Sequence, residues 1–391
     1  MLQIDPSKVL LIVNSDNAQS IADADDYVVK RGLNAAHRLG FAFGTSNAIL
    51  LPSQLKTSGG PACTTAPYTG QMFAPAIAAY QNANEIQAVI MSTYTPCRVD
   101  PQVVAQPGAV FTLAAYAGAA RFFNTFGAGS SPSYFSGDPV RTTIEEIIST
   151  APQDWIAVQS SSLGRVPHGR LGCPDYTSGT IAEIALRGSL GGGSIYTRAV
   201  TKALVSEATS KTSVQHALTQ VLDYSIISPA DNTTAFNWAK RIAMPNVANM
   251  GVDYVLSNAG TPPITLPGPL FALCLAEEFN SPLNIRDAFT CVDGAWGFMW
   301  TSSAGIFGDA LLYNGGSAAI MTFGEPYNYG MPAPNEVFIY ATRYQTSVML
   351  AGFLGYGNGC GFTVCGDPLY RPYLSTPTTN PVLGVQPYGH L

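Results

Sequence analysis

Uninterrupted apolar runs, each followed by a helix-like segment, constrain the fold of this chain more than any other feature. The first run is KVLLIVNS (8–15), and IQAVIMSTYTP (86–96) is a second one. Neither run alternates between polar and apolar residues, which is typical of strands covered by helices on both faces. Segments with helical character, 20–32 with Ser20 as N-cap and 72–84, lie between these runs. This order of strand, helix and strand favours parallel pairing.

The same rhythm restarts in the second half of the chain. There we expect strands at 252–260, 286–294 and 317–326, with a helix at 268–279 between the first two. Two successive rounds of buried strand and amphipathic helix predict an α/β fold. The arrangement that we expect is two flavodoxin-like, mostly parallel sheets flanked by helices.

A stretch rich in Gly, Ser and Pro separates the two rounds and predicts a boundary between subdomains. We place an N-terminal α/β subdomain at 1–126, ending in a helix at 109–126. A linker or exposed loop follows at 127–150, the C-terminal subdomain occupies 151–373, and an extended Pro-rich tail covers 374–391.

The chain carries unusually little charge. Charged residues make up 11% of its 391 residues and hydrophobic residues 47%, against roughly 25% charged in ordinary soluble domains. The net charge of −6 and the absence of any basic run argue against a nucleic-acid partner. A surface with little charge repels its own copies weakly, so this composition favours a secreted, surface-attached or assembled protein.

Targeting and cofactor signals are missing from the sequence. No apolar stretch reaches the roughly 20 residues of a membrane helix. The start does not resemble a signal peptide, because Asp5 and Lys8 precede an apolar run that is too short. The compartment stays open, with an extracellular or surface location favoured. The seven cysteines form no CxxC pair, so we expect no zinc or other metal and no cofactor. Cys360 and Cys365 either form a disulfide or remain buried thiols.

The segment FTCVDGAWGF (289–298) places Cys291 after an apolar run and before an Asp-Gly turn. With its neighbouring strands and helices, it resembles the catalytic subdomain of gingipain-type cysteine peptidases, which have a caspase-like fold. LGRVPHGRL (163–171) resembles the Gly-Arg-hydrophobic-Pro box of the same family. The resemblance implies that both sheets are caspase-like and that Cys291 occupies the place of the nucleophile.

A closer resemblance is to an uncharacterised bacterial family related to these peptidases. It rests on four boxes in the expected order: LLIVNSDNAQSIADADDYVVKRGL (10–33), IQAVIMSTYTPCRVD (86–100), Glu325-Pro326-Tyr327 and CGDPLYRPY (365–373). Glu325 and Asp367 lie in these boxes. We expect each of them to cap a helix or to hold Arg371 in a buried pair.

A cysteine nucleophile needs a depressed pKa and a histidine partner. In the gingipain arrangement that histidine would follow the strand at 252–258, and Ala259 stands there. His168, near a turn, is the alternative base. We interpret Cys291 as the remnant of an ancestral site, and we expect Trp296, Phe298 and Trp300 to fill or line the former cleft.

These observations lead to a functional hypothesis. We expect a catalytically inactive gingipain-like protein that acts as a self-assembling structural or surface subunit, with copies of itself as partners. Two alternatives stay open. One is an active cysteine peptidase using Cys291; the other is a ligand-binding module with a cleft at the carboxyl ends of the strands.

Overall fold

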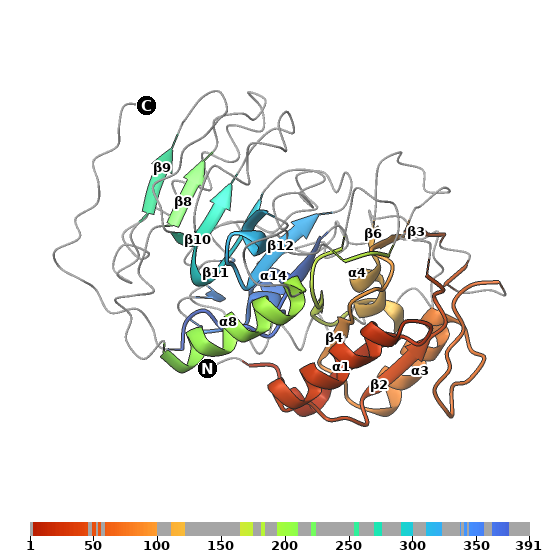
Figure 1. Ribbon diagram of the computed structural model, residues 1–391. Coiled ribbons are helices and arrows are strands. Elements are labelled where there is room, and N and C mark those ends of the chain that lie inside the picture. Colours follow the sequence, from red (N-terminus) through yellow and green to blue (C-terminus); the bar gives the residue numbers. More distant parts are fainter. Residues whose placement is uncertain are drawn as a thin grey trace.

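The protein is described here from a computed structural model. The structure describes residues 3–45, 49–51, 54–55, 59–99, 111–121, 165–174, 181–183, 194–209, 220–223, 254–257, 270–275, 291–299, 310–322, 337, 340–341, 344–355 and 362–374. Within these residues the chain is an α/β protein whose main sheet is mostly parallel and flanked by helices (Figure 1). The predicted fold class is therefore confirmed.

Ten of the described strands form the main sheet, in the order β2-β1-β4-β7-β13-β12-β11-β10-β8-β9. Their bounds are β1 Val9–Asn14, β2 Arg38–Phe41, β4 Ala88–Met91, β7 His168–Arg170, β8 Gln220–Asp223, β9 Tyr254–Ser257, β10 Leu270–Leu275, β11 Cys291–Met299, β12 Ala318–Thr322 and β13 Phe362–Gly366. A small second sheet has the order β3-β5-β6, with β3 Ile49–Leu50, β5 Arg98–Val99 and β6 Phe111–Thr112.

The main sheet consists of two parallel halves that run in opposite directions. The first half-sheet is β2-β1-β4-β7-β13 and the second is β12-β11-β10-β8-β9; all pairs within each half are parallel. The halves meet where β12 and β13 pair antiparallel, with Ile320 opposite Val364. The two expected sheets are thus joined into one. Strands β7 and β13, from the segment assigned to the C-terminal subdomain, complete the first half-sheet.

Helices cover both faces of this sheet. Their bounds are η1 Pro6–Lys8, α1 Ala18–Arg31, α3 Phe73–Ala83, α4 Leu113–Gly118, α8 Ile195–Thr209 and α14 Val348–Leu354. Odd-numbered residues of β1 (Val9, Leu11 and Val13) pack in one core with α1, α8 and α14. Its even-numbered residues (Leu10 and Ile12) pack in a second core with α3 and α4. A strand buried on both faces explains why its sequence shows no alternation.

Several local expectations are confirmed and several are wrong. The strand at 8–15 is β1, the helix at 72–84 is α3, and the helix at 20–32 is α1, which ends at Gly32 with φ of +64°. Its N-cap is Asn17 and not Ser20, because the Asn17 side chain accepts from the N–H groups of Gln19 and Ser20.

The helix expected at 268–279 contains strand β10 instead. The helix expected at 109–126 starts with strand β6 before the short α4. Among the described residues, no helix is long and apolar enough to cross a membrane.

Candidate functional site

Cys291 is the first residue of β11 and not the last residue of a strand, so the expected position of the nucleophile is wrong. Cys291 pairs with Leu270 and Trp296 with Ala272, so two steps along β10 accompany five along β11. The Asp293-Gly294 pair lies in this bulge, and Gly294 has φ of +83°. The expected Asp-Gly turn is therefore an irregularity that opens a strand. Cys291 lies at the amino edge of the second half-sheet.

The environment of Cys291 keeps its thiol protonated. Burial raises the pKa of Cys291 to about 12, and the nearby cations Lys202 and Arg198 oppose this rise without cancelling it. The thiolate is the nucleophilic form of cysteine, and catalytic cysteines have pKa values well below that of a free thiol. At neutral pH the thiol of Cys291 is therefore a poor nucleophile.

His168 lies on β7 in the first half-sheet, and β13 and β12 separate it from β11. Its Nε2 is 2.9 Å from the carbonyl oxygen of Phe362, which can only accept, so this nitrogen carries the proton and donates it. Burial lowers the pKa of His168 to about 4. The imidazole is a neutral, buried group of the core, and the structure does not bring it to Cys291.

The expected aromatic lining is partly inside the core. Trp296 is fully buried, and its ring meets that of Tyr373 edge to face at 6.2 Å. Tyr373 also contacts Phe271 of β10 edge to face at 5.7 Å. These rings therefore pack in the core against the second half-sheet and do not line an open surface. Phe298 lies on β11 opposite Cys274. Trp300, Glu325 and Ala259 lie outside the described residues.

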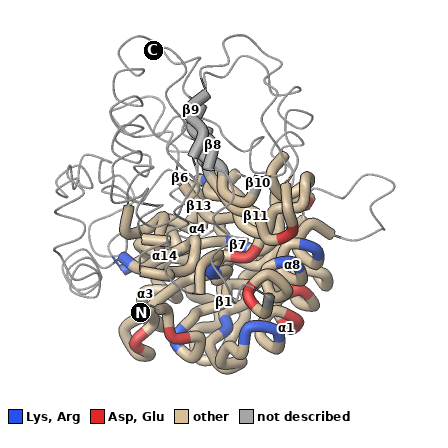
Figure 2. The backbone as a smooth tube through the Cα atoms, turned by 90° about the vertical axis from the view of Figure 1, so that its left-hand side faces the viewer, with Lys and Arg blue, Asp and Glu red and all other residues tan. Residues whose placement is uncertain are grey.

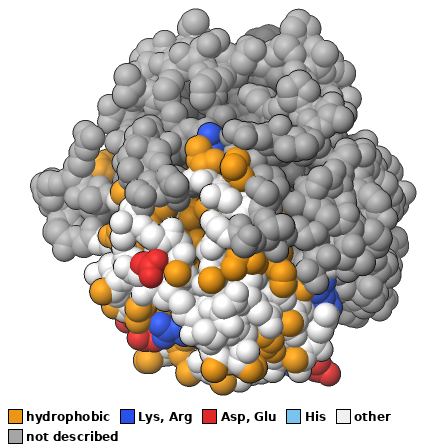
Figure 3. Space-filling view, turned by 90° about the vertical axis from the view of Figure 1, so that its right-hand side faces the viewer, with side chains coloured by type: hydrophobic (Ala, Val, Ile, Leu, Met, Phe, Trp, Pro, Cys, Tyr) orange, Lys and Arg blue, Asp and Glu red, His pale blue; other side chains and the backbone are white. Residues whose placement is uncertain are grey.

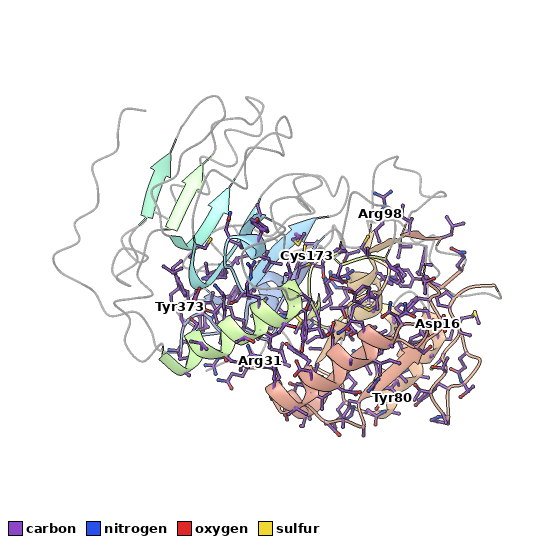
Figure 4. All side chains as sticks on the ribbon, in the orientation of Figure 1. Asp16, Arg31, Tyr80, Arg98, Cys173 and Tyr373 are labelled. Atoms are coloured by element: carbon purple, nitrogen blue, oxygen red, sulfur yellow. The ribbon has the colours of Figure 1, made fainter. Side chains whose placement is uncertain are left out.

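Asp367 is the expected site residue with the most developed surroundings. It follows β13 directly, is fully buried, and belongs to a group that we call the seam cluster: Tyr27, Arg31, Glu207 and Asp367. Arg31 lies where α1 and α8 run side by side (Figure 4).

The hydrogen bonds of the seam cluster join three parts of the chain. Arg31 donates through Nε (3.0 Å) and Nη2 to Asp367 Oδ2, and through Nη1 to Glu207 Oε2 at 2.6 Å. Tyr27 Oη donates to Asp367 Oδ1 at 2.8 Å. Burial acts to lower the pKa of Arg31, but Asp367 and Glu207 outweigh it and the pKa is raised. The cluster holds a charged guanidinium with all its nitrogen atoms paired.

The seam cluster corrects the expected partner of Asp367. Arg371 does not pair with Asp367; its backbone N–H donates to Glu207 Oε1 at 2.8 Å and its Nε to the carbonyl of Gln345. Sequence reasoning missed Arg31 and Glu207. Arg31 did carry a signal. It is the last residue of a helix, directly before the C-capping Gly32, within the segment 10–33 on which the resemblance partly rests. Glu207 offered no comparable signal.

A second polar group lies at the carboxyl ends of β1, β4 and β7, where the strand order reverses direction. Asn14 Nδ2 donates to the carbonyls of Gly44 (2.9 Å) and Tyr94 (2.8 Å). Arg170 at the end of β7 pairs with Glu183, and both side chains are buried. Ligands of open α/β sheets bind at such switch points. Here the polar groups mostly bind one another, so the arrangement serves first to hold the loops together.

The cysteines and acidic groups can be assessed as metal ligands only where the structure describes them. Cys365 is a buried free thiol, and Cys360 lies outside the described residues. No cluster of three or more metal-ligating side chains occurs in the part of the chain that the structure describes. Comparison with family descriptions, with curated proteins and with solved structures found no match for this chain.

Proposed function

We propose that this protein is a catalytically inactive, gingipain-like subunit that assembles with copies of itself into a structural or surface array. The observation that carries the first half of the proposal is the state of Cys291. Its thiol has a pKa near 12. Of the described histidines, His168 is separated from β11 by two strands and donates to a backbone carbonyl. Both properties oppose the thiolate chemistry of a peptidase.

The surface of the described residues supports the second half of the proposal. The face shown in Figure 3 presents hydrophobic and uncharged polar groups with few charged ones. Figure 2 shows that charged residues lie along α1 and α8. Several of these are already paired within the chain: Lys30 with Asp26, Lys202 with Asp293, and the seam cluster. Paired charges contribute little repulsion between copies.

We place the contact between copies on α1 and α8. The two most exposed large apolar side chains among the described residues are Val29 (81% exposed) on α1 and Val205 (52%) on α8. On α8 the exposed positions carry no charge; they are Thr197, Thr201, Val205 and Ala208. Small uncharged residues at helical spacing form a surface that a second helix pair can approach closely, and its occupant in this proposal is another copy of the chain.

The assembly is tested by measuring the mass of the full chain over a range of concentrations, by mass photometry and analytical ultracentrifugation. We expect particles larger than a monomer for the wild type. The double variant Val29→Lys/Val205→Lys places two cations on the proposed surface and should shift the population toward monomer. The matched control is Asn82→Lys, which changes an exposed position of α3 on the opposite face and should assemble like the wild type.

The outcomes separate the parts of the proposal. A wild-type chain that stays monomeric at high concentration rejects assembly and leaves a ligand-binding module as the better function. Assembly that survives the double lysine variant rejects the α1–α8 surface. The loss of activity is tested separately with a thiol-reactive peptide probe and mass spectrometry. Selective labelling of Cys291 in the folded protein, together with peptide cleavage that Cys291→Ala abolishes, would reject inactivity and support an active cysteine peptidase.

A further inference from the structure

Arg198, in the first turns of α8, has an unused hydrogen-bonding edge. Its Nε and Nη2 atoms are buried, and neither meets an acceptor in the part of the chain that the structure describes. The N–H bonds of these two atoms point in the same direction, because they lie on one edge of the planar guanidinium. This edge donates two parallel hydrogen bonds to a carboxylate or phosphate group.

The surroundings of Arg198 bring a second cation to the same place. Lys202 lies one turn further along α8, and its Nζ pairs with Asp293 in the bulge of β11. The turn before β12 closes the group: a Cβ on Gly315 would lie 3.4 Å from Lys202 Nζ and 3.6 Å from the carbonyl oxygen of Cys291. Among the described residues here, two cations and one carboxylate leave a local excess of one positive charge.

The unused edge is costly unless something binds it. A buried donor without an acceptor costs free energy, and a charged donor costs more than a neutral one. Burial lowers the pKa of Arg198, although Tyr313, Asp293 and Cys291 are near enough to oppose this effect. Asp293 is the natural internal acceptor, but it already pairs with Lys202 and its side chain is 66% exposed. Asp293 is thus engaged with Lys202 and does not accept from the unused edge of Arg198.

We propose that Arg198 binds a small oxyanion, a carboxylate or phosphate group held side-on by Nε and Nη2, with Lys202 as the second cation. The site lies at the amino edge of β11, beside the position of Cys291. The start of α8 adds little to it, because Ser194 already caps this helix end by accepting from the N–H of Thr197 at 3.2 Å. The proposal goes beyond the function proposed above and holds for a monomer as well as for an assembly.

The probes are sodium phosphate and sodium acetate, titrated into the full chain at an ionic strength held constant with sodium chloride. The first readout is the thermal unfolding midpoint, which rises when an anion binds the folded state alone. The second is the ¹H–¹⁵N signal of the Arg198 Nε–H group, which should shift on binding. We expect a saturable response to at least one probe, and the comparison of the two probes tells a phosphate receptor from a carboxylate receptor.

Two substitutions isolate the edge from the charge. Arg198→Lys keeps the positive charge and loses the paired donors, and Arg198→Gln loses both. We expect each to weaken binding of the anion by about ten- to a hundredfold, the value of charge-assisted hydrogen bonds. The matched control is Arg38→Gln, which removes a partly exposed arginine from its pair with Asp25 and should leave the response unchanged.

A further variant tests the competing explanation, in which Asp293 leaves Lys202 and satisfies Arg198 from within. Asp293→Asn removes the negative charge of that acceptor, and we expect the anion to bind equally well or more tightly. The proposal is overturned if neither probe gives a saturable response in the wild type or in Asp293→Asn. It is also overturned if Arg198→Lys and Arg198→Gln bind like the wild type, or if Arg38→Gln loses binding to the same extent.

Discussion

Arg31 and Arg198 lie on the neighbouring helices α1 and α8, yet their surroundings differ completely. Arg31 donates through all three guanidinium nitrogens to the carboxylates of Asp367 and Glu207. Arg198 has two buried nitrogens that meet no acceptor among the described residues. A buried cation contributes to a fold only when its partners are built in. The seam cluster is therefore complete within the chain, whereas the start of β11 is where we propose that a group from outside binds.

The largest expected effect comes from disrupting the seam cluster, in which Arg31 is fully paired. Asp367→Ala removes the acceptor of Tyr27 and of two of the three Arg31 nitrogens, and should lower the free energy of unfolding by about 3–5 kcal/mol. Urea denaturation at pH 7 measures the change. The control Asp25→Asn removes a 60% exposed partner of Arg38 and should cost about 1 kcal/mol or less. Equal losses in the two variants would mean that the seam cluster stabilises no more than a surface pair.

The second effect concerns His168, a buried group with a fixed hydrogen-bond partner and a titration that can be measured. His168 has a pKa of about 4 in the folded state, against 6.5 for an unperturbed histidine. Between these values the unfolded chain binds the extra proton, so stability is complete above pH 6.5 and falls as pH drops toward 4. The loss amounts to about 3 kcal/mol at about 1.4 kcal/mol per pKa unit.

His168→Gln keeps a side-chain donor for the carbonyl of Phe362 but does not titrate. The variant should therefore lose most of this contribution to the difference in unfolding free energy between pH 7 and pH 4.5. His37→Gln, at a partly exposed position, should retain it. A pH dependence that is unchanged in His168→Gln would show that other groups govern the acid limb.

The smallest expected effect concerns Arg198. Arg198→Met keeps an apolar side chain of similar length and removes the unsatisfied donors. In a buffer of chloride alone it should raise the free energy of unfolding by about 1 kcal/mol. The measurement is the same urea titration. A loss as large as that of Asp367→Ala would show that Arg198 already has a partner, and the contrast with Arg31 would disappear.

Much of the fold could be predicted because its signals are local. The run Val9–Asn14 has no polar interruption, and Gly32 supplies the positive φ that ends α1. Strand β10 was interpreted as a helix, because Leu and Ala in LFALCL favour helices and a short buried run carries no period that separates the two structures. Pairing with β11 on one side and β8 on the other outweighs that propensity.

The candidate sites were harder to predict, since their partners are far apart in sequence. Asp367 was singled out from its box, but its partner Arg31 is 336 residues away, and no spacing rule reaches that distance. The sequence predicts an irregularity at Asp293-Gly294, next to Cys291. It also predicts that Cys291 lies at the carboxyl end of a strand, whereas Cys291 is the first residue of β11. An apolar run, a turn and a second apolar run read the same whether the strand ends or begins at the turn.

The position of β13 has a consequence for how the chain reaches this structure. Residues 362–366 pair with residue 169 on one side and with residues 318–322 on the other, so the last described strand joins the two halves of the sheet. During synthesis, β7 emerges long before its neighbour β13 exists, so one side of β7 stays unpaired until residues 362–366 have been made. Late closure of this kind makes assembly of the sheet slow and sensitive to premature termination, since a fragment ending before residue 362 would expose an unpaired strand to other chains.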